Sequence, residues 1–191
     1  MFLLALFRGS ADAPSREEFE RSALPYLPEI YRTAVGLLGG NRTEAEDLAQ
    51  DVFLEAWKSF HRFEPGTNIR AWLHKILVYR ASHFRRRLFR LLPFGNKEET
   101  RGDLPAEEVP VEIAVPDHLS DRQVVNAVAK VPSPFREALI LADVRGFSYQ
   151  EIADMTGAPI GTVMSRLSRG RRLLREGLAA VAEERGLGGR R

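Results

Sequence analysis

The sequence predicts an all-α protein made of two small helical domains joined by a flexible acidic linker. Strand-like alternation is nearly absent, and apolar residues recur at helical spacing along most of the 191 residues. This spacing stops between Pro93 and Asp117, where proline and glycine accumulate. We therefore place domains at residues 15–92 and 119–180, with the linker at 93–118.

The bulk composition narrows the possible functions. The net charge is only +2 although the pI is 9.1, so the basic charge must be concentrated locally. There is no cysteine, which excludes disulfides and cysteine-containing zinc sites and fits a reducing cytoplasm. No apolar run approaches the roughly 20 residues of a membrane span. The apolar Met1–Phe7 stretch lacks the basic segment that precedes the core of a signal peptide. We expect a cytoplasmic protein and assign no role to residues 1–14.

Helices of the N-terminal domain are predicted at 15–23, 28–38 and 43–60, with a long fourth helix from about Asn68. A hydroxyl residue followed three positions later by Glu, the capping-box pattern, opens the first and the third of them. The two pairs are Ser15 with Glu18, and Thr43 with Glu46. Gly39-Gly40-Asn41 ends the second helix.

The predicted helix at 43–60 has an acidic outer side. Its polar residues are Glu44, Glu46, Asp47, Gln50, Asp51 and Glu55. One interpretation is an ordinary solvated face. A second makes Glu46, Asp47 and Asp51 metal ligands, but their spacing matches no dedicated site and no histidine joins them. A third is a docking face for a basic partner. We favour a protein partner, because an acidic face does not suit DNA contact.

The long helix after the Pro65–Asn68 loop becomes strongly basic toward its end. Its arginines there are Arg80, Arg85, Arg86, Arg87 and Arg90. Aromatic residues lie among them, which suits unpaired DNA because bases stack on rings and guanidinium groups. Core packing is the alternative role for the aromatics, and we accept it for most of Trp57, Phe60, Phe63 and Trp72. The histidines show no ligand spacing, so we expect no metal and no cofactor.

The linker and the helices after it differ in charge and in pattern. Residues 96–117 carry seven carboxylates against two basic residues. Ser120 with Gln123 is predicted to cap a helix that ends at Pro132. Ser133, as a cap followed by proline, then opens a helix that Gly146 closes.

The stretch Phe147–Arg175 has the pattern of a helix-turn-helix. Ser148 with Glu151 forms a capping box, and Gly157 suits a left-handed cap before a second helix that starts near Ile160. Val163, Leu167, Gly170 and Leu174 share one face of that helix. Met164, Ser165, Ser168, Arg169 and Arg172 are predicted on the opposite face. Because residues 162–175 contain five arginines and no acid, we predict DNA binding.

Three blocks in one order resemble the extracytoplasmic-function (ECF) sigma factors, the small two-domain sigma factors of bacterial RNA polymerase. The blocks are AEDLAQDVFLEAW at 45–57, GTNIRAWLHKI at 66–76 and FSYQEIADMTGAPIGTVMSRLSRGRRLL at 147–174. The resemblance implies a non-catalytic initiation factor whose partners are core RNA polymerase, through its β′ and β subunits, and promoter DNA, with no small-molecule substrate. Many members of that family are held by an anti-sigma factor, and the sequence leaves open whether this chain is.

The resemblance also implies roles for particular residues. Residues 15–92 become the domain that binds polymerase and melts the −10 element, and 119–180 become the reader of the −35 element. The polymerase-binding residues implied are Asp47, Gln50, Asp51 and Leu54. Those implied at the −10 element are Phe63, Asn68, Arg70, Trp72, Lys75, Tyr79, Arg80, His83, Arg86 and Arg87. Those implied at the −35 element are Tyr149, Thr162, Met164, Ser165, Arg166, Ser168, Arg169, Arg171 and Arg172.

One departure from the family concerns the −10 helix. Family members often carry an Asn and an Asp four residues apart where this chain has Tyr79 and His83, so their base preference is not transferable. Three other functions stay open: a self-sufficient helix-turn-helix regulator, a nuclease using the acidic carboxylates, and a pure interaction protein.

Overall fold

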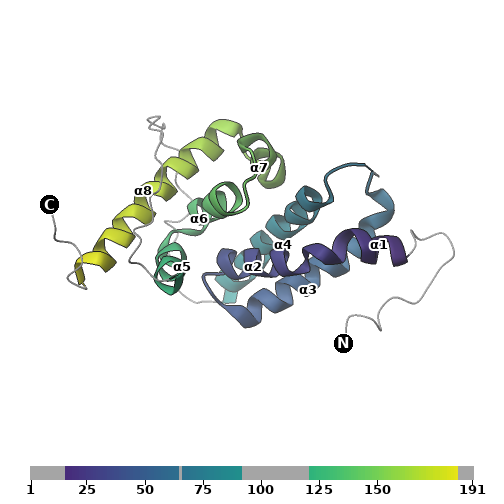
Figure 1. Cartoon of the computed structure of the whole chain (residues 1–191), viewed down its shortest axis with the longest axis horizontal. Coiled ribbons are helices and arrows are strands. Elements are labelled where there is room, and N and C mark those ends of the chain that lie inside the picture. The colour runs from purple at the N-terminus through teal and green to yellow at the C-terminus, as the bar shows by residue number, and fades with distance from the viewer. Residues whose placement is uncertain (1–15, 65, 92–120, 185–191) are drawn as a thin grey trace.

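The computed structural model describes residues 16–64, 66–91 and 121–184, and every regular element within these ranges is helical (Figure 1). The N-terminal half contains α1 (Arg16–Ala23), the 3-10 turn η2 (Leu24–Tyr26), α2 (Leu27–Leu37), α3 (Arg42–Ser59), the 3-10 turn η3 (Phe60–Arg62) and α4 (Ile69–Leu91). The C-terminal half contains α5 (Asp121–Lys130), α6 (Ser133–Leu139), the π-helical segment η5 (Ile140–Val144), α7 (Tyr149–Thr156) and α8 (Ile160–Glu184). The all-α prediction is confirmed. Ser15, Ser120 and the predicted linker at 93–118 lie outside the described residues.

Aromatic packing forms the core of the N-terminal half. Phe19 of α1 is buried and meets the rings of Phe53, Trp57 and Phe60 edge-on, with centroids 5.1 to 6.5 Å apart. Burying such a side chain stabilises the fold by about 1.5–3 kcal/mol. This packing joins the short helix α1 to α3, so α1 depends on tertiary contacts rather than on its own length.

The start of α3 differs from the prediction. The cap is Asn41, whose Oδ1 accepts a hydrogen bond from the backbone N–H of Glu44 at 3.2 Å. Gly39 and Gly40 have positive φ, and Asn41 is extended, so the chain enters the helix at Arg42. Thr43 is already helical, and the predicted Thr43–Glu46 box is therefore wrong.

The start of α6 is also shifted by one residue. Pro132 is the cap, and its carbonyl accepts hydrogen bonds from the N–H groups of Phe135 and Arg136 at 3.1 and 3.0 Å. Proline favours the extended backbone of a cap, and Ser133 becomes the first helical residue without a capping hydrogen bond. The prediction of Ser133 as the cap was wrong.

The helix-turn-helix was predicted correctly. The Ser148 hydroxyl accepts from the Glu151 N–H, and the Glu151 carboxylate accepts from the Ser148 N–H at 2.9 Å. The Ser148 N–H and the Ser148 hydroxyl both donate to the Glu151 carboxylate, and these two bonds hold the pKa of Glu151 below its usual range. Gly157 adopts φ 67°, a left-handed cap that glycine tolerates without strain, and α8 starts at Ile160.

The two halves pack directly against each other. Helix α4 lies along α7, and α2 contacts α5 and α6 (Figure 1). The buried side chain of Ile140 belongs to the N-terminal core, and Val78 belongs to the core of the helix-turn-helix. We call this interface between the two halves, formed by α2 and α4 on one side and by α5, α6, η5 and α7 on the other, the joint. Among the described helices, none is long and apolar enough to cross a membrane.

Candidate nucleic-acid interface

The outer side of α3 presents its polar residues to solvent. Asp47, Gln50 and Asp51 are exposed, and Leu54 beside them is half-buried. The opposite side is anchored in the core by Leu48 and the other residues of the apolar stripe. Within residues 16–64, 66–91 and 121–184, no three His, Asp or Glu side chains gather where they could hold a metal ion. This geometry gives the metal interpretation no support.

A cluster of three aromatic side chains lies at the base of the loop before α4. Phe60 and Phe63 are stacked, with centroids 5.7 Å apart and ring planes 6° apart, and Phe63 contacts Trp72 at 5.1 Å. Phe60 is buried, whereas Phe63 and Trp72 are half-buried. The Oδ1 of Asn68 accepts from the Ala71 N–H at 3.1 Å and so caps α4. Phe63 and Trp72 thus contribute to the core and also reach the surface at this loop.

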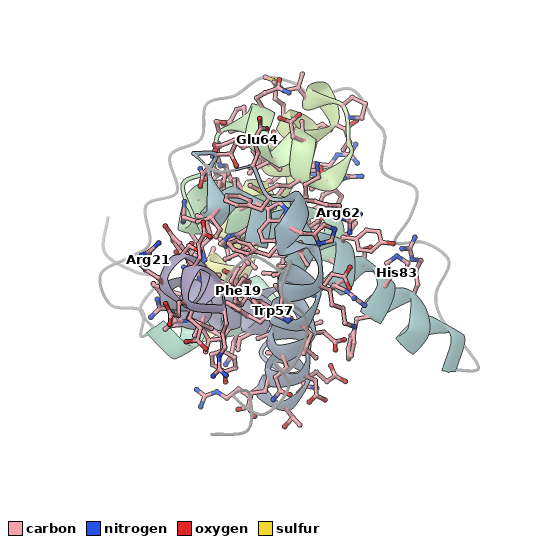
Figure 2. All side chains as sticks on the ribbon, turned by 90° about the vertical axis from the view of Figure 1, so that its right-hand side faces the viewer. Phe19, Arg21, Trp57, Arg62, Glu64 and His83 are labelled. Carbon is pink, nitrogen blue, oxygen red and sulfur yellow. The ribbon has the colours of Figure 1, made fainter. Side chains whose placement is uncertain are left out.

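The outward flank of α4 carries a stripe of cationic and aromatic side chains. Lys75, Tyr79, His83 and Arg86 are all exposed, and their spacing of three or four residues puts them on one helical face. Tyr79 is 59% exposed, and its ring meets that of His83 at 4.5 Å. Figure 2 shows His83 on this flank, away from Phe19 and Trp57. We call these four residues the α4 stripe; the side chain of Arg87 lies outside the described set.

Two other arginines predicted to bind DNA have partners within the protein. Arg80 forms an ion pair with Glu55 of α3. Arg70 pairs with Glu29 of α2 at 2.7 Å and donates a hydrogen bond to the carbonyl of Arg145 at 2.6 Å. Its guanidinium lies 4.4 Å from the centre of the Phe147 ring. Burial raises the pKa of Glu29, but Arg70, with smaller contributions from His74 and Arg145, outweighs burial and holds this pKa below its usual value.

His74 is fully buried beside this pair. Its Nδ1 lies 2.8 Å from the carbonyl of Arg70, and its Nε2 lies 3.5 Å from the Glu29 carboxylate. Burial lowers the pKa of His74 to about 4, although the hydrogen bond to the Arg70 carbonyl and the charge of Glu29 both act to raise it. The imidazole is therefore neutral at pH 7, and its role is structural. This agrees with the absence of ligand spacing in the sequence.

The N-terminal part of α8 carries most of the predicted −35 residues near the surface. Tyr149 and Arg172 are exposed, and the half-buried set is Thr162, Met164, Arg166, Ser168 and Arg169. Ser165 is an exception: it is 8% exposed, and its hydroxyl donates to the Thr162 carbonyl at 3.0 Å. Its predicted outward orientation is wrong. Helix α8 packs against α5, α6 and α7, so its buried arc is wider than one apolar stripe.

Arg171 is held by the protein itself. Its Nε and NH2 donate to the two carboxylate oxygens of Asp143 at 3.1 and 2.6 Å, in the two-pronged geometry that arginine forms with carboxylates. Asp143, with a smaller contribution from Tyr149, raises the pKa of Arg171 above its already high usual value. This pair ties η5 to α8. Arg171 therefore supports the helix-turn-helix from within the protein.

Family models and known proteins match both halves. The model of Sigma-70 region 2 covers residues 24–90, and that of Sigma-70, region 4 covers residues 121–174. The ECF RNA polymerase sigma factor SigE of Mycolicibacterium smegmatis is 32% identical over 180 residues, which cover 94% of this chain and 69% of that relative. The chain belongs to the ECF sigma factors. Its function is therefore promoter-specific initiation of transcription by RNA polymerase, and the family consists of initiation factors without catalysis of their own.

Two further relatives support the assignment to the ECF sigma factors. EcfG of Rhodopseudomonas palustris is 32% identical over 160 residues, which cover 83% of each chain. The sigma factor RpoE of Bartonella quintana, solved in complex with the anti-sigma factor NepR, superposes with a TM-score of 0.66 at 33% identity. That match covers 85% of this chain and 97% of RpoE. Region 2 thus contains the acidic side of α3 and the α4 stripe, and region 4 contains the helix-turn-helix.

Sequence reasoning did not find the residues of the joint. Thr33, Arg136, Arg145 and Phe147 connect the two halves through contacts between positions far apart in the chain. Phe147 was expected only as the start of the helix-turn-helix. No local pattern identifies such partners, because each side chain is unremarkable within its own helix or turn.

Proposed function

We propose that the acidic side of α3 is the docking surface for core RNA polymerase, through Asp47, Gln50, Asp51 and Leu54. The exposed carboxylates suit a basic surface, and complementary charge speeds association and fixes orientation. Half-buried Leu54 adds an apolar contact at the edge of this surface. The proposed partner surfaces lie on the β′ and β subunits of the polymerase.

The α4 stripe is the proposed reader of the −10 element. Lys75 and Arg86 supply charge for phosphates, and the rings of Tyr79 and His83 supply stacking surface for unpaired bases. Phe63, Trp72 and the loop at Asn68 lie ahead of the stripe, and we assign them to capture of a base that leaves the stack. Stacking tolerates any base, so Tyr79 is expected to stabilise open DNA more than to select its sequence.

Helix α8 is the proposed reader of the −35 element. The N-terminal turns of a recognition helix reach base edges in the major groove. Thr162, Met164, Ser168 and Arg169 have the position for this role, with Arg166, Arg172 and Tyr149 nearer the phosphates. Ser165 and Arg171 support the helix from within the protein, because Ser165 is buried and Arg171 is paired with Asp143.

Melting in this proposal is driven by binding energy alone. Unstacking a base costs a few kcal/mol, and rings and a pocket on the protein offset that cost. The chain needs no cofactor, metal or small-molecule substrate for this. It works in the cytoplasm with the polymerase. An anti-sigma factor belongs to the proposed partners, because RpoE was solved with NepR.

The observation that carries the proposal is that one small bundle presents both an exposed acidic side and a cationic–aromatic stripe. A gel shift with a promoter duplex tests whether the chain needs bound core polymerase before its cationic–aromatic stripe can bind DNA. The chain alone is expected to bind weakly, and the chain with core polymerase tightly. Core with the Tyr79→Phe variant is the matched control. Strong, sequence-specific binding by the chain alone would instead support a self-sufficient helix-turn-helix regulator.

A further inference from the structure

Arg171 lies in the same row of α8 as two residues that we assign to the −35 element. Met164, Ser168 and Arg171 are spaced by four and then three residues, so they follow one face of the helix. The exposed Arg172, which we assign to the phosphates, comes directly after Arg171. A free guanidinium at position 171 would therefore stand beside the DNA backbone.

The Arg171 guanidinium is not free, because Asp143 of η5 engages it with both carboxylate oxygens, at 3.1 and 2.6 Å. The pair as a whole is neutral and offers no net charge to a phosphate. The side chains of Arg171 and Asp143 are 19% and 29% exposed, so the pair lies at the protein surface rather than in the core. Ion pairs with this much exposure add little to folding stability, so stability alone gives Asp143 only a small role.

The number of free cations on α8 determines how tightly it holds DNA of any sequence. Phosphate contacts add affinity but carry no sequence information, whereas base contacts distinguish one sequence from another. Residues 162–175 contain five arginines and no acid, and the carboxylate that offsets one of them comes from η5, outside the helix. The pair therefore removes one sequence-independent contact and leaves the proposed base contacts unchanged.

We propose that Asp143 limits the sequence-independent affinity of the −35 reader by holding Arg171 away from the DNA backbone. Asp143 is thus a positioning residue that acts through Arg171 and itself touches no base. This inference rests on the proposed −35 reader and adds a residue outside the recognition helix that sets its strength of binding. A promoter competes with a very large number of other DNA sites, so a lower affinity for any sequence leaves more polymerase free to find the promoter.

Core polymerase reconstituted with the full chain tests this role on two DNA probes. One probe is the duplex that the parent selects from a pool randomised at the −35 element, and the other is the unselected pool. The affinity for each is measured over a range of salt concentrations. Asp143→Ala and the isosteric Asp143→Asn remove the charge that holds Arg171, and Asp143→Ala/Arg171→Gln restores the parent's net charge. The matched control is Asp154→Ala, which deletes an exposed carboxylate of α7 whose hydrogen-bond partner is Gln150 rather than an arginine.

Both single variants at Asp143 are expected to bind the two probes several-fold more tightly. The plot of log affinity against log salt concentration should be steeper by about one, because one more phosphate is neutralised. The ratio of the two affinities should stay that of the parent, since the added contact is blind to sequence. The double variant and Asp154→Ala should keep the slope of the parent.

An unchanged slope in both Asp143 variants, or an equal change in Asp154→Ala, overturns the proposal. So does a loss of affinity for the selected duplex alone that the double variant shares, because Asp143 would then only maintain the fold of the helix-turn-helix. If the parent selects no −35 sequence from the pool, the proposed −35 reader is wrong and this inference falls with it. Selection by the parent with unchanged slopes refutes the role of Asp143 alone.

Discussion

At the scale of single residues, surroundings rather than residue type decide what each side chain does. His74 and His83 lie on the same helix, yet one is fully buried at the joint and the other is exposed beside Tyr79. Arg70 and Arg86 likewise differ: Arg70 is half-buried and contacts Arg145 and Phe147 of the other half, whereas Arg86 is exposed. The pattern of basic residues in the sequence could not separate these roles.

The buried His74 predicts a pH-dependent stability. Its folded pKa of about 4 lies below the usual 6.5, so the unfolded chain binds the extra proton between these values and stability falls as the pH drops through that window. From pH 7 to pH 5 we expect a loss of about 2 kcal/mol. Urea denaturation at both pH values measures it. His74→Gln should flatten the dependence, and the exposed His61→Gln should not. Equal dependence in the parent and His74→Gln would refute the assignment.

The exposed Tyr79 ring predicts a stacking contribution at the −10 element. Tyr79→Ala should weaken binding of a single-stranded −10 oligonucleotide by polymerase containing this chain by about 1–3 kcal/mol. Tyr79→Phe keeps the ring and should bind nearly as well as the parent. The measurement is a competition titration with oligonucleotides that differ in one base. If Phe and Ala weaken binding equally, the hydroxyl rather than the ring makes the contact.

At the scale of elements, both ends of α7 were predicted correctly, whereas the caps predicted for α3 and α6 were wrong. The Ser148–Glu151 box and Gly157 cap were found because both act within a few residues. At α3 the cap is Asn41 rather than the predicted Thr43, because Asn41 follows two glycines of positive φ and has the extended backbone of a cap. The π-helical η5 was not predicted, since the sequence indicated a regular helix up to Gly146.

The cap of α3 can be tested by two matched substitutions. Asn41→Ala removes the acceptor of the Glu44 N–H and should lower the free energy of unfolding by about 1 kcal/mol. Thr43→Ala, two residues later on the exposed side, should change it by less than about 0.5 kcal/mol. Chemical denaturation of both variants decides between them. A larger loss from Thr43→Ala would restore the box predicted from the sequence.

The exposed acidic side of α3 predicts a binding defect without a folding defect. Asp47→Lys/Asp51→Lys reverses two exposed charges and should weaken core binding at least about tenfold, mainly through slower association. Its urea midpoint should stay close to that of the parent. The control is Glu17→Lys, at an exposed position of α1, which should leave the affinity for core unchanged. Equal effects of both changes would point to net charge rather than a docking surface.

At the scale of the whole molecule, the helices and motifs could be predicted from the sequence. The structure adds that the two halves pack against each other. The helical class, the helix-turn-helix and the family were accessible because they depend on local periodicity and ordered motifs. The joint was not, because the bond from Arg145 to Thr33 spans 112 positions and depends on the backbone of η5. The two DNA-reading domains were expected to be separate, but in this structure they pack against each other.

Reconstituted run-off transcription tests the central claim most directly, namely that this chain directs polymerase through one acidic docking surface and two DNA readers. Purified core with the chain should give a transcript from its cognate promoter. Changing either promoter element should abolish the transcript, and so should the Asp47→Lys/Asp51→Lys variant. A transcript that is indifferent to both elements, or unaffected by the charge reversal, would contradict the account.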